Sequence, residues 1–269
     1  MLVGSGSLRS TTKRLEISIV AGTVFSAGRE VFLPNREREL LFAIARRRGS
    51  ISAEALMDDL WPDRDADAAA DLLKSHLYYL RRRLADPAAV LRNSDGLCLR
   101  DDASVDLWEI GSALAARRGK TIEDAVQYTT AREIYDRLRS APPARVMSWR
   151  WFGPVAARIA GMRREVLQAL ADYEMRRGRR SEALALAHEI IDHDPFDEEA
   201  HEIAIALLFA MGNWAAALRE FRQYRTILRE EFACEPSPAL VSLLKSAPPN
   251  AARSDELYTD IYADITASS

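Results

Sequence analysis

The sequence predicts a mainly helical protein with a small β component, divided into an N-terminal part of mixed structure and a C-terminal part of repeated helices. Three observations lead to this prediction. Short segments in the first hundred or so residues alternate apolar and polar side chains, as half-buried strands do. Beyond residue 105 the apolar spacing becomes almost wholly helical. Two segments of that second part are similar at a separation of 34 residues, a period typical of helix-pair repeats.

Length and composition fit a folded protein with two modest domains. The chain has 269 residues, 48% of them hydrophobic and 29% charged, as in globular proteins. A formal net charge of −3 argues against a protein that coats nucleic acid non-specifically. No apolar stretch is long enough to span a membrane and residues 1–7 lack the apolar core of a secretory signal, so we expect a cytoplasmic protein with no membrane partner. Cys98 and Cys234 lie in apolar patterns and are expected to be buried free thiols.

The N-terminal part should begin with strands and continue with two helices. Residues 15–20 alternate apolar and polar side chains, and residues 31–33 continue the strand character after a turn. Asn35 is a suitable N-cap for a first helix, which ends at three arginines and a glycine. Ser52 caps a second, shorter helix that ends at Trp61.

A third helix, at about residues 68–84, has two contrasting faces. Its buried stripe consists of four leucines at helical spacing: Leu73, Leu77, Leu80 and Leu84. At about 100° per residue, the opposite face with its flanks consists of Asp71, Lys74, Ser75, His76, Tyr78, Tyr79, Arg81, Arg82 and Arg83. Hydroxyls, aromatic rings and cations suit phosphate oxygens and base edges of DNA. An ordinary solvated surface helix is the alternative interpretation.

A hairpin is predicted next, because residues 90–92 and 97–99 form short strand patterns around a turn that contains Asp95 and Gly96. Strands, three helices and a terminal hairpin, in this order, make a winged helix-turn-helix. We expect this domain to occupy residues 15–101 after a flexible segment 1–14, and to be separable from the rest near residues 101–104.

Residues 15–101 resemble the OmpR-type DNA-binding domain at the start of the Streptomyces antibiotic regulatory proteins (SARPs). The segments that carry the resemblance are 38–41 (RELL), 56–61 (LMDDLW) and 76–84 (HLYYLRRRL). The resemblance implies that the third helix enters the major groove and that the hairpin approaches the neighbouring minor groove. The residues that it implies in DNA binding are Lys74, Ser75, Tyr78, Tyr79 and Arg82, with Arg81 touching at most the DNA backbone. The chain departs from the family at Asp71 and at the hairpin turn, so Arg92 or Arg100 has to supply the positive charge of the hairpin.

The C-terminal part, residues 105–245, is predicted to be a tetratricopeptide-like repeat domain. Residues 177–184 (RGRRSEAL) recur as residues 211–218 (MGNWAAAL), which places Gly178 and Gly212, and likewise Ala183 and Ala217, 34 residues apart. Each glycine should end the first helix of a pair, and each alanine should let the second helix pack closely.

Residues 200–238 and the aromatic segment 149–152 (WRWF) resemble the bacterial transcriptional activator domain of the same SARP family. With both domains in the family's order, the resemblance implies an activator of transcription. It also implies double-stranded promoter DNA as a ligand, RNA polymerase holoenzyme as a partner, and a homodimer on tandem sites. The acidic tail, residues 246–269, is expected to be loose. As an alternative, Leu257, Ile261 and Ile265 could form the apolar side of a docking helix.

The sequence contains no pattern that predicts catalysis. Neither a phosphate-binding loop nor a dinucleotide-binding glycine motif occurs. His188 and His201 each begin a zinc-protease-like pattern, but Asp192 and Ile205 stand where the second histidine is required. We therefore expect no catalytic residues, no cofactor, no metal and no enzyme activity. The alternative to a DNA-binding regulator is an interaction scaffold whose winged helix no longer binds DNA.

Overall fold

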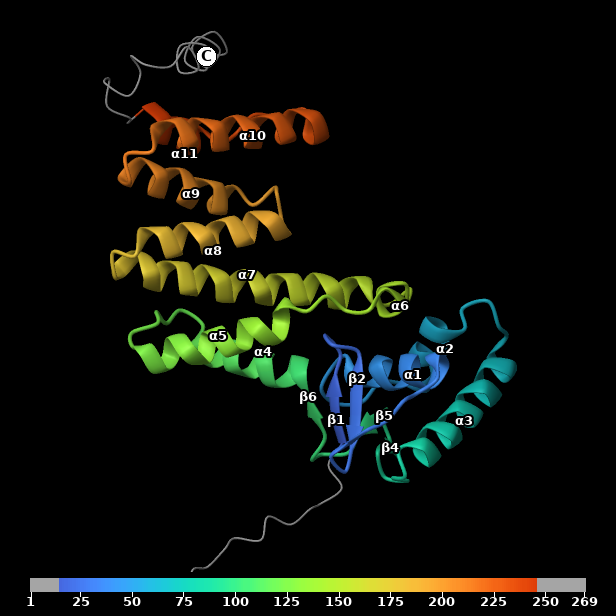
Figure 1. Ribbon diagram of the computed structural model, residues 1–269. Helices are drawn as coiled ribbons and strands as arrows, with labels where there is room; N and C mark the ends of the chain where they lie inside the picture. The colour runs from blue at the N-terminus through green and yellow to red at the C-terminus, as the bar shows by residue number, and fades with distance from the viewer. Residues whose placement is uncertain (1–14, 246–269) are drawn as a thin grey trace, which may run out of the picture. The chain divides into compact units, whose positions relative to one another are not determined.

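The computed structural model describes residues 15–245, and the chain divides into two compact units (Figure 1). The first unit consists of Met1–Arg118 and Asp136–Met162, and the second of Gly119–Tyr135 and Arg163–Ser269. The first unit contains the strands β1 (Leu15–Ser18), β2 (Thr23–Ser26), β3 (Arg29–Glu30), β4 (Val90–Asn93), β5 (Gly96–Leu99) and β6 (Ser104–Val105), and the helices α1 (Asn35–Ala45), α2 (Ala53–Leu60), α3 (Ala66–Arg83), α4 (Asp106–Arg117) and α6 (Ala144–Met147). The second unit contains α8 (Arg180–His193), α9 (Glu198–Ala210), α10 (Trp214–Phe232) and α11 (Pro238–Lys245), while α5 (Ala125–Arg139) and α7 (Gly153–Arg176) contribute residues to both units.

A four-stranded sheet opens the first unit, in the order β3-β2-β1-β6. Figure 1 labels β1, β2 and β6 of this sheet. β1 pairs antiparallel with β2, and β2 pairs antiparallel with β3. The two-residue strand β6 joins the other side of β1 in parallel. Directly after β6, the Asp106 carboxylate accepts hydrogen bonds from the backbone N–H groups of Ile19 (3.0 Å) and Val20 (3.1 Å). These hydrogen bonds hold the segment that follows the hairpin beside the end of β1.

Two details of the N-terminal sequence prediction are wrong. Residues 31–33 do not form a strand; the chain pairs instead at β2 and β3, and leaves the sheet so that Leu33 becomes buried (1% exposed) while Phe32 points to solvent (77% exposed). Asn35 is the first residue of α1 and not its N-cap, because Pro34 takes that position with an extended backbone. Proline fits there because the first N–H groups of a helix have no partner within the helix.

The first three helices, α1 to α3, lie where the sequence predicted them, with small differences at their ends. The hydroxyl of Ser52 accepts a hydrogen bond from the N–H of Ala55 (3.1 Å) and caps α2. Asp65 caps α3 by accepting from the N–H of Ala68 (2.8 Å), so this helix begins two residues earlier than predicted. The leucine stripe of α3 is buried throughout: Leu73, Leu77, Leu80 and Leu84.

The hairpin pairs β4 with β5 and is fixed to the segment between α1 and α2. Leu97 and Ile51 exchange backbone hydrogen bonds of 2.8 and 2.9 Å. Gly96 has a φ of +129°, and a Cβ atom there would lie 2.1 Å from the carbonyl oxygen of Ile51. Only glycine therefore fits at this close backbone approach.

In the second unit, successive helices from α7 to α10 run antiparallel (Figure 1). Gly178 (φ +72°) and Gly212 (φ +73°) follow α7 and α9 with nearly the same backbone conformation. Ala183 and Ala217 are both fully buried. The repeat prediction and the mainly helical fold class are thus confirmed.

The cysteine prediction is wrong as regards burial. Both thiols are free, but Cys98 is half-buried and Cys234 is exposed. In β5 the buried side chains alternate at Leu97 and Leu99, which leaves Cys98 on the other side of the hairpin. Cys234 follows the left-handed residue Ala233, beyond the last buried residue of α10.

Both terminal segments, 1–14 and 246–269, lie outside the described residues. Within residues 15–245, no helix is long and apolar enough to cross a membrane.

Candidate nucleic-acid interface

The outward face of α3 presents two tyrosine rings to solvent. Tyr78 is 60% exposed and Tyr79 is 49% exposed, and their ring centroids lie 5.4 Å apart in a T-shaped arrangement. Ser75 and Arg82 are exposed on the same face. Since the leucines of the opposite face are buried, one side of the helix packs into the domain and the other side is exposed to solvent.

The positive charge of this region comes from Arg82 on the face itself and from Lys74 and Arg83 on its two flanks. The ammonium group of Lys74 lies 3.1 Å from the carboxylate of Asp71, and both side chains are more than 70% exposed. Such a surface pair contributes little to stability, so Lys74 can exchange Asp71 for another anion. Within residues 15–245, no salt bridge joins Arg82 or Arg83 to an acidic side chain.

Arg81 differs from its neighbours because its guanidinium is engaged within the domain. Its Nε and one terminal nitrogen donate to the carbonyl oxygen of Val90 at 3.2 and 2.7 Å. These bonds join α3 to the first strand of the hairpin. Arg81 therefore positions the hairpin relative to α3, a role that helical spacing could not reveal.

Of the two arginines considered for the hairpin, Arg92 is exposed and Arg100 is engaged. The guanidinium of Arg100 lies between the carboxylates of Asp86 (2.5 Å) and Asp102. The hydrogen bonds that the guanidinium donates to Asp102 and Asp86 raise the pKa of Arg100. Arg92 stands on β4 and is the hairpin cation available to a ligand.

A groove of about 440 Å³ runs between α2, α3 and the hairpin. Lys74, Arg81 and Arg92 line it above an apolar floor that includes Leu73 and Leu77. The structure thus brings together three of the predicted cations, from α3 and from β4, along one side of the outward face. His76 does not belong to this set, because its ring stacks on Trp61 and its Nδ1 lies 3.1 Å from Glu37 Oε1.

The aromatic segment 149–152 packs into the first unit. The ring of Trp149 meets that of Phe42 edge-on at 5.7 Å, and the guanidinium of Arg46 lies 5.2 Å from the ring centroid of Trp151. Arg46 also pairs with Asp59 of α2 at 2.6 Å. A segment far along the chain therefore supports the helices that carry the candidate interface.

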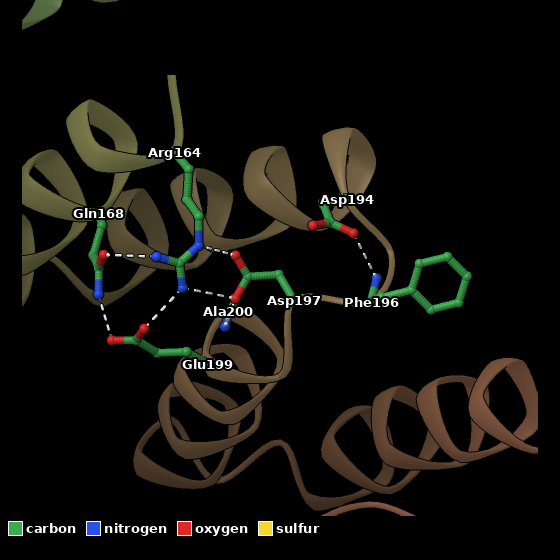
Figure 2. Close-up of polar contacts among 7 residues, drawn as sticks. All are labelled: Arg164, Gln168, Asp194, Phe196, Asp197, Glu199 and Ala200. Carbon is green, nitrogen blue, oxygen red and sulfur yellow. Dashed lines mark hydrogen bonds and ion pairs between the residues drawn. The ribbon is translucent and has the colours of Figure 1, made fainter. Parts of the chain in front are cut away.

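The second unit holds a polar cluster that joins α7 to the start of α9 (Figure 2). The guanidinium of Arg164 donates to both oxygens of Asp197 and to Glu199 (2.8 Å), and Gln168 donates to Glu199. Asp197 also caps α9 by accepting from the N–H of Ala200 (3.1 Å). Burial is the largest influence and raises the pKa of Asp197, but the hydrogen bonds from Arg164 and from the N–H of Ala200, with the charges of Arg164 and His201, together hold it below its usual value. This cluster stabilises the helix stack.

Two histidines of the second unit, His188 and His201, lie beside the carboxylate of Glu220. His201 is buried and its Nδ1 lies 2.9 Å from Glu220 Oε1, while His188 Nε2 lies 3.5 Å from Glu220 Oε2. The imidazoles of His188 and His201 lower the pKa of Glu220 to about 2. Among residues 15–245, no group of three or more His, Cys, Asp or Glu side chains is arranged to hold a metal ion.

Comparison with known proteins identifies the family. The family described as "Bacterial transcriptional activator domain" matches residues 100–246, more than half of the 269 residues. The chain belongs to this family. This membership confirms the resemblance to the bacterial transcriptional activator domain that the sequence indicated. The family is one of transcriptional activators and not of enzymes, as expected.

Relatives support the same assignment to the bacterial transcriptional activator domain family. The chain is 26% identical over 216 residues to "Regulatory protein AfsR" of Streptomyces coelicolor, which covers 77% of this chain and 21% of that protein. It is 24% identical to "Regulatory protein AfsR" of Streptomyces griseus, with 77% and 22% covered. The chain therefore spans about a fifth of the length of these relatives.

A solved structure shows the same fold. It is that of Mycobacterium tuberculosis EmbR in complex with a low affinity phosphopeptide. The TM-score is 0.68 at 20% sequence identity, and the match covers 95% of this chain and 71% of the EmbR chain. The winged helix followed by a helical region is thereby confirmed.

Proposed function

We propose that this chain is a sequence-specific regulator, and an activator, of transcription that binds double-stranded promoter DNA through α3 and the β4–β5 hairpin. One observation carries the proposal. In a chain of a transcriptional activator family, the helix anchored by four buried leucines presents Ser75, Tyr78, Tyr79 and Arg82 on its solvent face. Hydroxyl, aromatic and guanidinium groups on one helix face suit the base edges of a major groove.

The flanking cations supply the contact with the DNA backbone. Lys74 and Arg92 are exposed and line one groove, which supports a contact of both side chains with DNA phosphates. Arg81 contributes through its bonds to Val90, which hold the hairpin beside α3, and its charge adds to the same field. Binding should therefore weaken as salt rises.

The repeat unit is proposed to provide protein contacts. Helix-pair repeats build surfaces for partners and α7 to α10 form such a stack. RNA polymerase holoenzyme and a second copy of the chain on tandem sites are the partners that the family suggests. Because the proposed ligand, promoter DNA, is part of the bacterial chromosome, we expect a cytoplasmic location.

A second candidate function is an interaction scaffold whose winged helix does not bind DNA. Two acidic side chains favour this candidate. Asp71 pairs with Lys74 on α3, and Asp95 lies at the tip of the hairpin. Retention of the full chain on random duplex DNA, and its loss with salt, separates the two candidates.

The deciding experiment removes two side chains from the outward face. A duplex is first selected from a random library with the full chain, and affinity is then measured at several salt concentrations. The double variant Arg82→Ala, Tyr79→Ala should lose specific binding, because each good base contact is worth about 1–3 kcal/mol. Its melting temperature should hardly change, since both side chains are exposed.

Two controls accompany this variant. Arg48→Ala combined with Phe32→Ala removes an exposed arginine and an exposed aromatic ring away from α3, and should bind as the unaltered chain does. Leu77→Ala, in the buried stripe, should cost about 2–5 kcal/mol of folding stability instead. Unchanged operator affinity in the folded Arg82→Ala, Tyr79→Ala variant would refute the proposed interface and favour the scaffold.

A further inference from the structure

Resting on the proposed function, we infer that Tyr78 and Tyr79 read thymine, by packing their rings against its 5-methyl group in the major groove. The operator should then carry thymine where this pair lies. Arg82, beside the pair on the same helix face, is left to read guanine.

The exposure of the two rings is the first argument. Tyr78 and Tyr79 are the tyrosines of α3, their rings contact each other, and their side chains are 60% and 49% exposed. Adjacent exposed aromatic side chains form an apolar surface in contact with water, and such surfaces mark interaction sites. A thymine methyl group is the apolar feature that a major groove offers.

The composition of the helix is the second argument. Asparagine and glutamine pair bidentately with adenine, and α3 contains neither residue. The Asp71 carboxylate, released when Lys74 meets a phosphate, can accept from the amino group of cytosine and so reads a G·C pair and not an A·T pair. The Ser75 hydroxyl can bond to several base edges and so discriminates little. An A·T pair can therefore be distinguished by this helix chiefly from its thymine side.

The spacing of the rings is the third argument. Their centroids lie 5.4 Å apart and their planes are inclined by 71°. Successive bases on one strand are separated by about 3.4 Å along the axis. The pair therefore spans adjacent base steps, and we expect one or two thymines in succession at this position.

The test changes the methyl group alone. Thymines of the selected duplex are replaced one at a time by deoxyuridine, which keeps the base pairing and the O4 acceptor. The unaltered full chain should lose affinity by about fourfold at each contacted position, the factor that corresponds to burial of one methyl-sized group. Replacement elsewhere in the duplex should have no effect.

Variants separate the ring from its hydroxyl. Tyr78→Phe and Tyr79→Phe keep the rings and should keep the preference for thymine over deoxyuridine. The double variant Tyr78→Ala, Tyr79→Ala should bind the two duplexes equally, with an unchanged melting temperature because both side chains are exposed. Phe32→Ala removes an exposed ring outside α3 and should retain the full thymine preference.

The outcomes distinguish this inference from the proposed function. Specific binding that no deoxyuridine replacement weakens would overturn the reading of thymine and leave the DNA-binding function intact. Loss of affinity for every duplex in the Tyr→Phe variants would assign the contact to the hydroxyl and a phosphate, and would also overturn it. If the random library yields no preferred sequence, the proposed function itself fails.

Discussion

Glu220 illustrates at the scale of single residues how charge stabilises the repeat unit. Its carboxylate lies 2.9 Å from Nδ1 of the buried His201 and 3.5 Å from Nε2 of His188. The folded-state pKa of about 2 is below the ordinary 4.5, so the carboxylate stabilises the fold above about pH 4.5 and loses this effect as pH falls toward 2. We expect Glu220→Gln to lower the free energy of unfolding at neutral pH by about 1.5–3 kcal/mol, a range typical of hydrogen bonds to charged groups.

Urea denaturation of the two proteins between pH 7 and pH 2.5 measures this effect. The stability difference should shrink steadily below pH 4.5, because the unaltered carboxylate then becomes protonated in the unfolded state first. Glu230→Gln, an exposed position on the same helix, serves as the control and should show no such trend. Parallel pH curves for Glu220→Gln and the unaltered chain would contradict the assignment.

At the scale of elements, the hairpin depends on one backbone contact. Gly96 combines a φ of +129° with a Cβ position only 2.1 Å from the carbonyl oxygen of Ile51. We predict that Gly96→Ala separates β5 from Ile51 and destabilises the first unit. The proposed DNA binding should weaken as well, because the hairpin that carries Arg92 is then displaced. Gly28→Ala is the matched control: its φ is +74° but nothing lies within 4 Å of the added Cβ, so backbone strain alone should cost about 1–2 kcal/mol.

Chemical denaturation and limited proteolysis of the hairpin distinguish the two glycine variants. Protease sensitivity at β4–β5 should rise in Gly96→Ala and stay unchanged in Gly28→Ala. Equal stability loss in both variants would mean that the Ile51 contact does not hold the hairpin.

At the scale of the whole molecule, the contacts of the first unit bear on where the chain can be divided. A domain separable near residues 101–104 should fold alone as fragment 1–104 and keep DNA binding at reduced affinity, and this stays a prediction. A fragment ending there lacks Asp106, which accepts from the N–H groups of Ile19 and Val20, and Trp149, which packs on Phe42. We expect fragment 1–104 to melt at a clearly lower temperature than fragment 1–162, which contains the whole first unit.

Thermal melts of the two fragments and of the full chain check this expectation, with DNA titration of each. Equal melting temperatures would show that the segment after β6 contributes nothing to the winged helix. A fragment 1–104 that is insoluble or does not bind DNA, beside an active full chain, would contradict independent domains.

Much of this fold could be predicted because its signals are local. The leucine spacing of α3 marks the buried face before any partner is known, since helical geometry alone puts Leu73, Leu77 and Leu80 on one side. The 34-residue interval between Gly178 and Gly212 likewise predicts two helix ends of the same kind, and both glycines have a left-handed backbone. The exposed face with Tyr78 and Tyr79 follows from the same geometry.

The pairings between distant segments, in contrast, can be seen only in the tertiary structure. The parallel pairing of β6 with β1 involves two residues and has no periodic signature. Helical spacing put Arg81 on the flank of α3, but only the position of β4 shows that its guanidinium bonds to the Val90 carbonyl. Sequence periodicity tells which side of an element is buried, because that depends on the element's own geometry. Which group a side chain contacts depends on where the other elements pack. The sequence pattern of one element does not contain that information.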